Sequence, residues 1–209
     1  MRNQLRFIAG AIVVALLSIV RAGAAADAPG KSAHTANGLA SPESFASIRD
    51  PQKRSEAYFA ELGKVLTHQR CINCHPSGDV PHQGDSRRLH QPPVSRGSDG
   101  FGTETMRCNT CHMGSTFEPG RVPGHPAWHL APLEMAWEGK TLPQICQQIK
   151  DPKRNGNRSL KDLIEHIGDD TLVGWAWHPG NGREPAPGTQ KQAKALVEAW
   201  ANSGAACPQ

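Results

Sequence analysis

The chain has 209 residues and is poor in aromatic residues (5%), with 21 glycines and 17 prolines. Its net charge is +4, but three arginines and no acids lie in the first 26 residues, so the remainder carries only about +1. No basic patch with interleaved aromatic residues is left, which argues against a nucleic-acid partner. So small an apolar core needs support from disulfides, a metal or a cofactor.

Residues 1–26 have the pattern of a secretory signal peptide. Arg2 and Arg6 precede an apolar run from Phe7 to Val20, and Ala24-Ala25-Ala26 forms an A-x-A cleavage site. The run is shorter than the roughly 20 residues that a membrane helix needs. We expect export to the periplasm, removal of the signal and no membrane span afterwards; Arg21, inside the cleavage region, leaves an uncleaved anchor as the alternative.

The rest of the chain predicts a polar, disordered lead-in over residues 27–40 and one domain over residues 41–209. Ser41-Pro42 and Asp50-Pro51 are helix-start signals. From Pro51 onward, apolar residues recur at helical spacing and predict a helix that runs into the first cysteine pair; they are Phe59, Leu62, Val65 and Leu66.

Two segments match the pattern C-x-x-C-H: Cys71 to His75 and Cys108 to His112. This spacing lets two thiols bond covalently to haem while the histidine binds the iron. We therefore expect two covalently attached haem c groups, held by Cys71, Cys74, His75, Cys108, Cys111 and His112. A zinc clamp is the alternative, but 33 residues separate the two cysteine pairs, more than the roughly 15 to 20 of a zinc ribbon. A thioredoxin-type redox pair would need a βαβ context.

The last two cysteines, Cys146 and Cys207, predict a disulfide in an exported chain. Two unpaired buried thiols are the alternative.

Residues 76–107, between the two motifs, lack periodicity, and four arginines there are candidates for pairing with haem propionates or for the ordinary surface. They are Arg87, Arg88, Arg96 and Arg107. Downstream, short helices are predicted over 133–139, 142–150, 160–168 and around 193–200, and nothing alternates long enough for a sheet. The fold class is therefore mainly α with extensive loops. The motifs begin 37 residues apart, too close for two fused domains, so we expect a single compact dihaem cytochrome c-type domain.

The sixth iron ligand decides between an electron carrier and a catalyst. We favour His90 for the first haem, with His68 and His82 as rivals, and His129 for the second, with Met135 as its main rival. His125 and His178 are further candidates, while His34 lies in the predicted lead-in and His166 is interpreted as a solvated side chain.

Several tracts resemble a family of small exported dihaem proteins often labelled isoquinoline 1-oxidoreductase subunits. They are LTHQRCINCHPSGD, HQPPVSRG, MRCNTCH, VPGHPAWHLAPLEMAWEGK, DPKRNGNRSL, GWAWHPGNGREPAPGTQ and GAACP. The resemblance covers nearly all of residues 57–208 and is close around His90, His129 and Met135. It implies a c-type haem protein that accepts electrons from a periplasmic dehydrogenase. A subunit with two [2Fe–2S] clusters would need eight cysteine ligands, and this chain has six cysteines.

These patterns predict a periplasmic dihaem electron-transfer protein whose partner is a periplasmic dehydrogenase or another cytochrome. The alternative is a small peroxidase-like haem enzyme with one open iron site, in which a spare histidine such as His125 acts as acid and base. A redox or gas sensor is the third hypothesis.

Overall fold

The computed structural model describes residues 38–209, which belong to one compact unit. The predicted signal peptide, most of the predicted lead-in and His34 lie outside the described residues. The predicted disorder is wrong for residues 38–40: Leu39 is buried in the core, and the Ala40 N–H donates to Glu61 Oε1 at 2.8 Å.

Helices dominate the described chain, together with long loops and two very small sheets. The α-helices are α1 (Pro51–Leu66), α2 (Gln69–Ile72), α3 (Leu142–Lys150), α4 (Leu160–Gly168), α5 (Thr171–Gly174) and α6 (Gln190–Asn202). Single 3₁₀ turns cover Pro42–Phe45, Cys108–Thr110, Glu118–Gly120, Leu133–Met135 and Trp175–Trp177. The coarse prediction of a mainly helical chain with extensive loops is confirmed.

Helix starts follow local side-chain chemistry. The Asp50 carboxylate accepts hydrogen bonds from the Gln52 and Lys53 N–H groups at the start of α1, and Pro51 occupies a position where no donor is needed. Capping boxes begin α3 at Thr141 and α4 at Ser159. These caps explain why three of the predicted helices lie where the sequence placed them.

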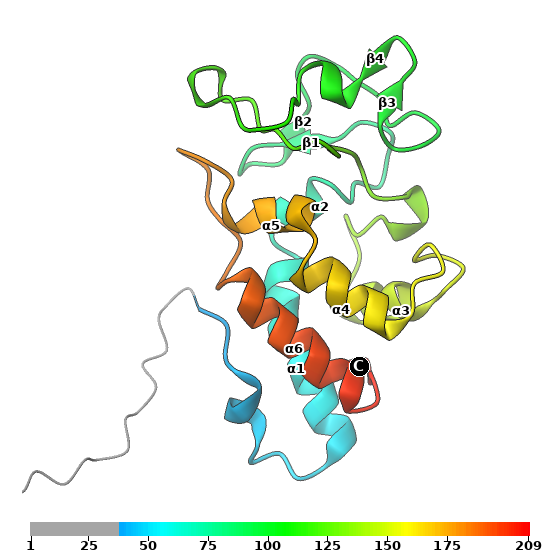
Figure 1. The fold of residues 1–209 in the computed structure, drawn as a ribbon. Coiled ribbons are helices and arrows are strands. Elements are labelled where there is room, and N and C mark those ends of the chain that lie inside the picture. Colours follow the sequence, from blue (N-terminus) through cyan, green and yellow to red (C-terminus); the bar gives the residue numbers. More distant parts are fainter. Residues whose placement is uncertain (1–37) are drawn as a thin grey trace, which may run out of the picture. The chain divides into compact units, whose positions relative to one another are not determined.

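The core lies where α1, α4 and α6 pack together (Figure 1). The rings of Phe59 on α1 and Trp200 on α6 have their centroids 5.0 Å apart, and both side chains are fully buried. The Ser55 hydroxyl donates to the Trp200 carbonyl and accepts from the Ala206 N–H. The packing therefore satisfies the polar groups as well as the apolar surface at the end of α6.

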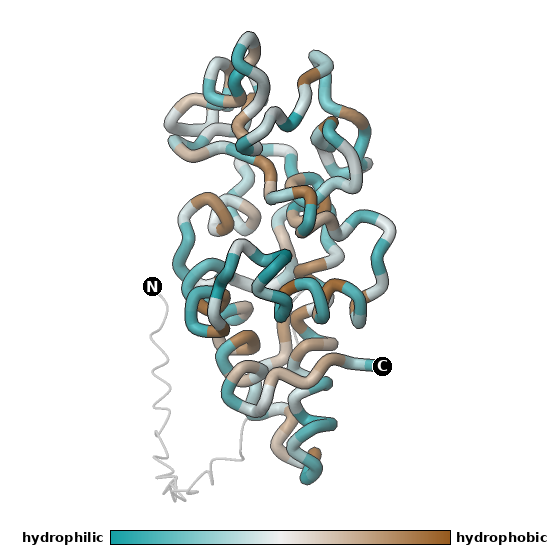
Figure 2. Tube along the Cα trace, turned by 90° about the vertical axis from the view of Figure 1, so that its right-hand side faces the viewer, coloured by the Kyte–Doolittle hydropathy of each residue, from teal (hydrophilic) through white to brown (hydrophobic). Residues whose placement is uncertain are grey.

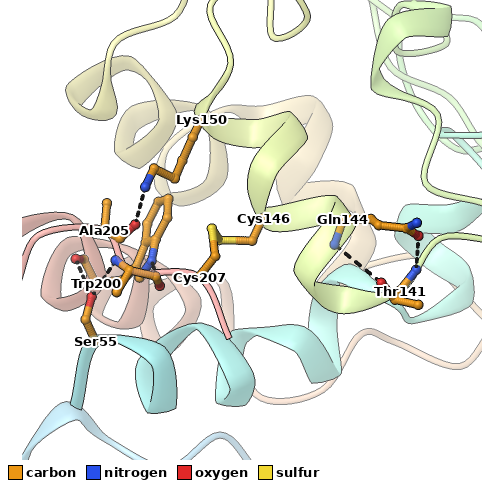
Figure 3. The surroundings of a disulfide bond; sticks show 9 residues. Ser55, Thr141, Gln144, Cys146, Lys150, Trp200, Ala205 and Cys207 are labelled. Atoms are coloured by element: carbon orange, nitrogen blue, oxygen red, sulfur yellow. Dashed lines mark hydrogen bonds between the residues drawn. A yellow bond between two sulfur atoms is a disulfide. The ribbon is translucent and has the colours of Figure 1, made fainter. Parts of the chain in front are cut away.

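A disulfide joins Cys146 on α3 to Cys207 near the C-terminus, as the sequence predicted (Figure 3). The bond is fully buried on the Cys146 side, and nearby the Lys150 ammonium donates to the Ala205 carbonyl at 2.7 Å. The C-terminal residues are thereby attached to the middle of the chain.

The segment between the two C-x-x-C-H motifs forms two hairpins rather than an unbroken loop. Strand β1 (His82–Gln83) pairs antiparallel with β2 (Arg88–Leu89), and β3 (Gly102–Thr103) pairs antiparallel with β4 (Met106–Arg107). Strands of two residues are too short to show alternation, so the sequence pattern does not reveal them. Figure 2 shows hydrophilic and hydrophobic residues interspersed along the described chain.

The predicted helix over 133–139 is wrong beyond its first turn. A 3₁₀ turn covers Leu133–Met135, and Ala136 is extended. The Trp137 and Glu138 N–H groups donate to the His75 carbonyl at 2.9 and 3.3 Å, so these donors are used for a tertiary contact instead of a helix.

Among residues 38–209, no helix is both long and apolar enough to cross a bilayer.

Replacing both Cys146 and Cys207 by alanine should lower the free energy of unfolding by about 4 kcal/mol, because the bridge spans 61 residues and restricts the unfolded chain. Denaturant unfolding of the variant and of the wild type, with and without reductant, measures the change. Reductant should destabilise the wild type and leave the variant unchanged. Equal stability of the oxidised wild type and the variant would contradict the prediction.

Candidate functional site

The first C-x-x-C-H motif lies at the end of a rigid helical segment. Helix α1 ends at Leu66, and the short α2 follows at once, with the His68 ring accepting a hydrogen bond from the Arg70 N–H as its N-cap. Cys71 lies on α2, and the His75 N–H closes the turn by donating to the Cys71 and Ile72 carbonyls. Both thiols and the imidazole are therefore presented at defined positions, while His68 serves as a cap.

The His75 ring is held on two sides by the segment that follows the second motif. Its Nδ1 lies 2.7 Å from the Met135 carbonyl oxygen, and its ring stacks on Trp137 with centroids 3.6 Å apart. A carbonyl can only accept, so Nδ1 carries the proton and Nε2 has a free lone pair. Burial lowers the pKa of His75 to about 4. The imidazole is therefore neutral near pH 7, the form that binds a metal.

His112 of the second motif has the same environment, built from different residues. Strand β4 leads into the 3₁₀ turn that carries Cys108. The His112 Nδ1 lies 2.7 Å from the Pro123 carbonyl oxygen, and the ring stacks on Trp128 with centroids 4.8 Å apart and nearly parallel planes. Burial lowers the pKa of this imidazole as well. Both motif histidines thus keep a free Nε2.

One segment, residues 123–137, makes all of these contacts. It supplies a carbonyl and a tryptophan to each motif histidine, and its Ala131 N–H also donates to the Cys74 carbonyl at 3.0 Å. We name it the clamp segment. The sequence analysis names His125, His129 and Met135 of this segment as candidate ligands, but the role of its backbone carbonyls carries no sequence signal.

The four motif cysteines are unpaired thiols in the structure. Burial raises the pKa of Cys71 to about 12 and that of Cys74 to about 11, and it also raises the pKa of Cys108. Redox-active C-x-x-C pairs have a lowered thiol pKa instead. The electrostatics therefore argue against a thioredoxin-type function for the first pair.

Two cavities adjoin the motifs. The first, of about 140 Å³, is bounded by Cys71, Cys74 and His75 on one side and by side chains of α4 and α5 on the other. The second, of about 830 Å³, is bounded by Cys108, Cys111 and His112. Only the second is in the range of about 300–1,000 Å³ typical of cofactor sites, so the walls of the first must separate to admit a large group.

The cavities are neighbours, because the same five residues line both. They are Arg70, Cys74, Trp128, His129 and Trp175. The Trp128 and Trp175 rings meet edge to face with centroids 4.9 Å apart, and the Arg70 guanidinium lies 5.9 Å from the centroid of the Trp175 ring. An aromatic wall therefore separates the two cavities.

The candidate sixth ligands are distributed differently from the sequence hypothesis. His90 was favoured for the first motif, but its ring lies 5.8 Å from that of His112, in the second. His129 was favoured for the second motif; it lines both cavities and stacks on Phe101 with centroids 4.6 Å apart.

The rings of other candidates are engaged by the protein. Both ring nitrogens of His82 have partners, the Arg87 carbonyl at 2.6 Å and Glu138 Oε1 at 3.3 Å. His125 accepts from the Ala127 N–H and contacts the Thr171 hydroxyl. His178 is exposed and has its Nδ1 3.4 Å from the Gly174 carbonyl oxygen.

His166, interpreted from the sequence as solvated, lines the first cavity. Its Nδ1 lies 3.2 Å from Asp170 Oδ2, and burial lowers its pKa. Asp170 follows His166 by four residues, but it lies beyond the end of α4 and caps α5. The side chain of Met135 is also buried beside this cavity, while its carbonyl holds His75.

Arg96, a candidate propionate partner, instead joins three segments of backbone. It is buried, and it donates to the carbonyls of Pro76, Gly78 and Ala131. This links the loop after the first motif to the clamp segment. Arg107 pairs with Asp99 at 2.8 Å, so its charge is also used locally. Arg88, Arg96 and Arg107 all line the second cavity.

One buried donor of the first cavity, the Trp137 indole N–H, has no hydrogen-bond partner among the described residues. Buried donors normally have partners, and a group bound from outside can supply them. Within residues 38–209, no three histidine, cysteine or carboxylate side chains gather as a metal-ion site.

Comparison with protein-family models, curated proteins and solved structures gives no match to this chain.

Substituting Arg96 by lysine should lower the free energy of unfolding by about 2 kcal/mol, since an ammonium cannot reach all three carbonyls and leaves buried acceptors unpaired. Arg107→Lys is the matched control, with a smaller expected loss because its ion pair with Asp99 is exposed to solvent. Thermal and denaturant unfolding measure both. Equal effects of the two substitutions would show that Arg96 does not have this linking role.

Proposed function

We propose that this chain is a periplasmic dihaem c-type cytochrome that transfers electrons. One observation carries the proposal: each C-x-x-C-H histidine has its Nδ1 held by a carbonyl of the clamp segment and its Nε2 free, next to two unpaired thiols. Haem c needs this combination of two thiols and one oriented neutral imidazole. The pattern occurs twice, with a tryptophan stacked on the histidine each time.

The residues that would hold the first haem are Cys71, Cys74 and His75, and those for the second are Cys108, Cys111 and His112. Haem iron takes only one or two protein ligands, because the porphyrin supplies four nitrogens. This suits the two motif histidines, because in the described chain neither belongs to a group of three side chains that could hold a metal ion on its own. When bound, haem supplies an iron that changes its charge by one electron.

The clamp segment controls how each imidazole would present itself to iron. Hydrogen bonding at Nδ1 sets the tautomer and the ring orientation, and the nature of the acceptor tunes the basicity of the ligand. Both acceptors here are neutral carbonyls of Met135 and Pro123 rather than carboxylates. At the first motif, packing beside α4, α5 and Trp137 also limits access of water, which is a second determinant of reduction potential.

The shared wall between the cavities supports electron transfer rather than two independent sites. Trp128, which stacks on His112, also lines the first cavity. Haems bound in the two cavities would therefore be close neighbours, and an electron accepted by one could pass to the other. The resemblance noted in the sequence is consistent with a partner that is a periplasmic dehydrogenase or a second cytochrome. Export through residues 1–26 belongs to the same proposal.

The purified exported protein should carry two covalent haems per chain, by mass and by haemochrome absorbance. Cys71→Ala with Cys74→Ala should remove one haem, as should Cys108→Ala with Cys111→Ala, because each thiol pair forms the thioether bonds of one group. The disulfide variant lacking Cys146 and Cys207 is the control and should retain both. A wild-type chain without covalent haem would refute the proposed function.

The ferric wild-type protein should contain two low-spin, six-coordinate haems in optical and EPR spectra, as expected of a carrier. Replacing both His129 and His166 by alanine should convert one haem to a high-spin form that binds cyanide, because these are the spare imidazoles of the first cavity. The two single variants then identify the ligand. His82→Ala is the control and should leave both haems low-spin.

Two unchanged haems in the His129 and His166 double variant would assign the first iron to Met135 sulfur instead. A high-spin haem in the wild type that binds cyanide or peroxide rapidly would favour the peroxidase-like enzyme over the electron carrier.

A further inference from the structure

We propose that His90 is the second axial ligand of the iron held at His112, which makes the second cavity a bis-imidazole haem site. The inference rests on the proposed function and adds to it the ligand set of one haem. It reverses the sequence hypothesis, in which His90 served the first motif.

The separation of the two rings carries the assignment. The centroids of the His90 and His112 rings are 5.8 Å apart. A metal bound to two imidazoles through bonds of about 2 Å places the facing nitrogens about 4 Å apart and the ring centres about 6 Å apart. The two imidazoles thus already have the spacing of a bis-histidine pair. Both rings line the second cavity, whose volume of about 830 Å³ suits a cofactor.

The hydrogen bonds of both rings leave the appropriate nitrogen free. His90 Nδ1 lies 2.8 Å from the Pro92 carbonyl oxygen, and His112 Nδ1 lies 2.7 Å from that of Pro123. Each Nδ1 is therefore the protonated nitrogen, and each Nε2 has a lone pair that is free to bind a metal. Both imidazoles that line the second cavity thus have a protonated Nδ1 held by a carbonyl and an unprotonated Nε2.

The first hairpin determines where the His90 ring lies. His90 directly follows β2, and its N–H donates to the Pro81 carbonyl at 3.0 Å, just before β1. The Gln91 N–H donates to the Gln83 side chain at 3.1 Å. Pro81 and Gln83, just before and on β1, therefore hold the backbone at His90 and Gln91. His82, on β1 of the same hairpin, has both nitrogens engaged by Arg87 and Glu138 and provides a matched control.

A second imidazole has functional consequences for this haem. Bis-histidine iron generally has a lower potential than iron with a methionine ligand. If haem is bound at His112, His90 would also keep peroxide and oxygen from reaching its iron. The second haem would then serve electron transfer only.

The test is His90→Ala in the full-length exported protein, with His82→Ala as the control. In ferric optical and EPR spectra we expect one of two haems to become high-spin in the His90 variant, and external imidazole to restore the low-spin form. The His82 variant should retain two low-spin haems. Two low-spin haems in the His90 variant would overturn the inference, whereas absence of covalent haem from the wild type would overturn the proposed function itself.

Single-haem chains assign the affected iron to its motif. With Cys71 and Cys74 replaced by alanine, only the second haem remains, and adding His90→Ala should make it high-spin. With Cys108 and Cys111 replaced, His90→Ala should leave the remaining haem unchanged. The opposite result would return His90 to the first motif and overturn the inference.

Where a single-haem chain does not accumulate, pairs of substitutions in the two-haem protein serve the same purpose. His90→Ala combined with His112→Ala should alter only one haem, because both residues act on the same iron. His90→Ala combined with His75→Ala should alter both haems. The reverse pattern would contradict the assignment.

Discussion

The contact on which the candidate site depends is the hydrogen bond from each motif histidine to a backbone carbonyl of the clamp segment. Met135 and Pro123 supply these carbonyls, at 2.7 Å in both cases. Each bond determines the tautomer of its imidazole and leaves Nε2 available. Because both carbonyls belong to one stretch of chain, the orientation of one histidine is coupled to that of the other.

The remaining structure holds this stretch in place. Arg96 ties it to the loop after the first motif, and the Leu130 N–H donates to the Gly100 carbonyl near the second hairpin. Gln148 on α3 donates to the carbonyls of Glu134 and Ala136, on either side of Met135. The same helix carries Cys146, whose disulfide secures it to the C-terminal residues (Figure 3). The helical core and the histidine sites are therefore mechanically connected through α3.

Residues with strong local chemistry were predictable from the sequence. Asp50-Pro51, Thr141 and Ser159 begin helices because their side chains pair with nearby backbone donors, and this needs no distant partner. The spacing of C-x-x-C-H identified both thiol pairs and both motif histidines. The pairing of Cys146 with Cys207 followed because only two cysteines were left over. By contrast, the helix predicted after Leu133 failed, because two of its donors bond to His75 instead.

The sequence alone determined which residues form the two motifs, where most helices begin and which cysteines pair, because short-range spacing and cysteine number decide these. Only the tertiary structure decided which imidazole faces which motif. His90 lies between the motifs in sequence and could have met either ring, and hairpin pairing places it beside His112. His166 reaches the first cavity only because α4 packs against it. Loop closure over such distances depends on long-range packing, which no local pattern encodes.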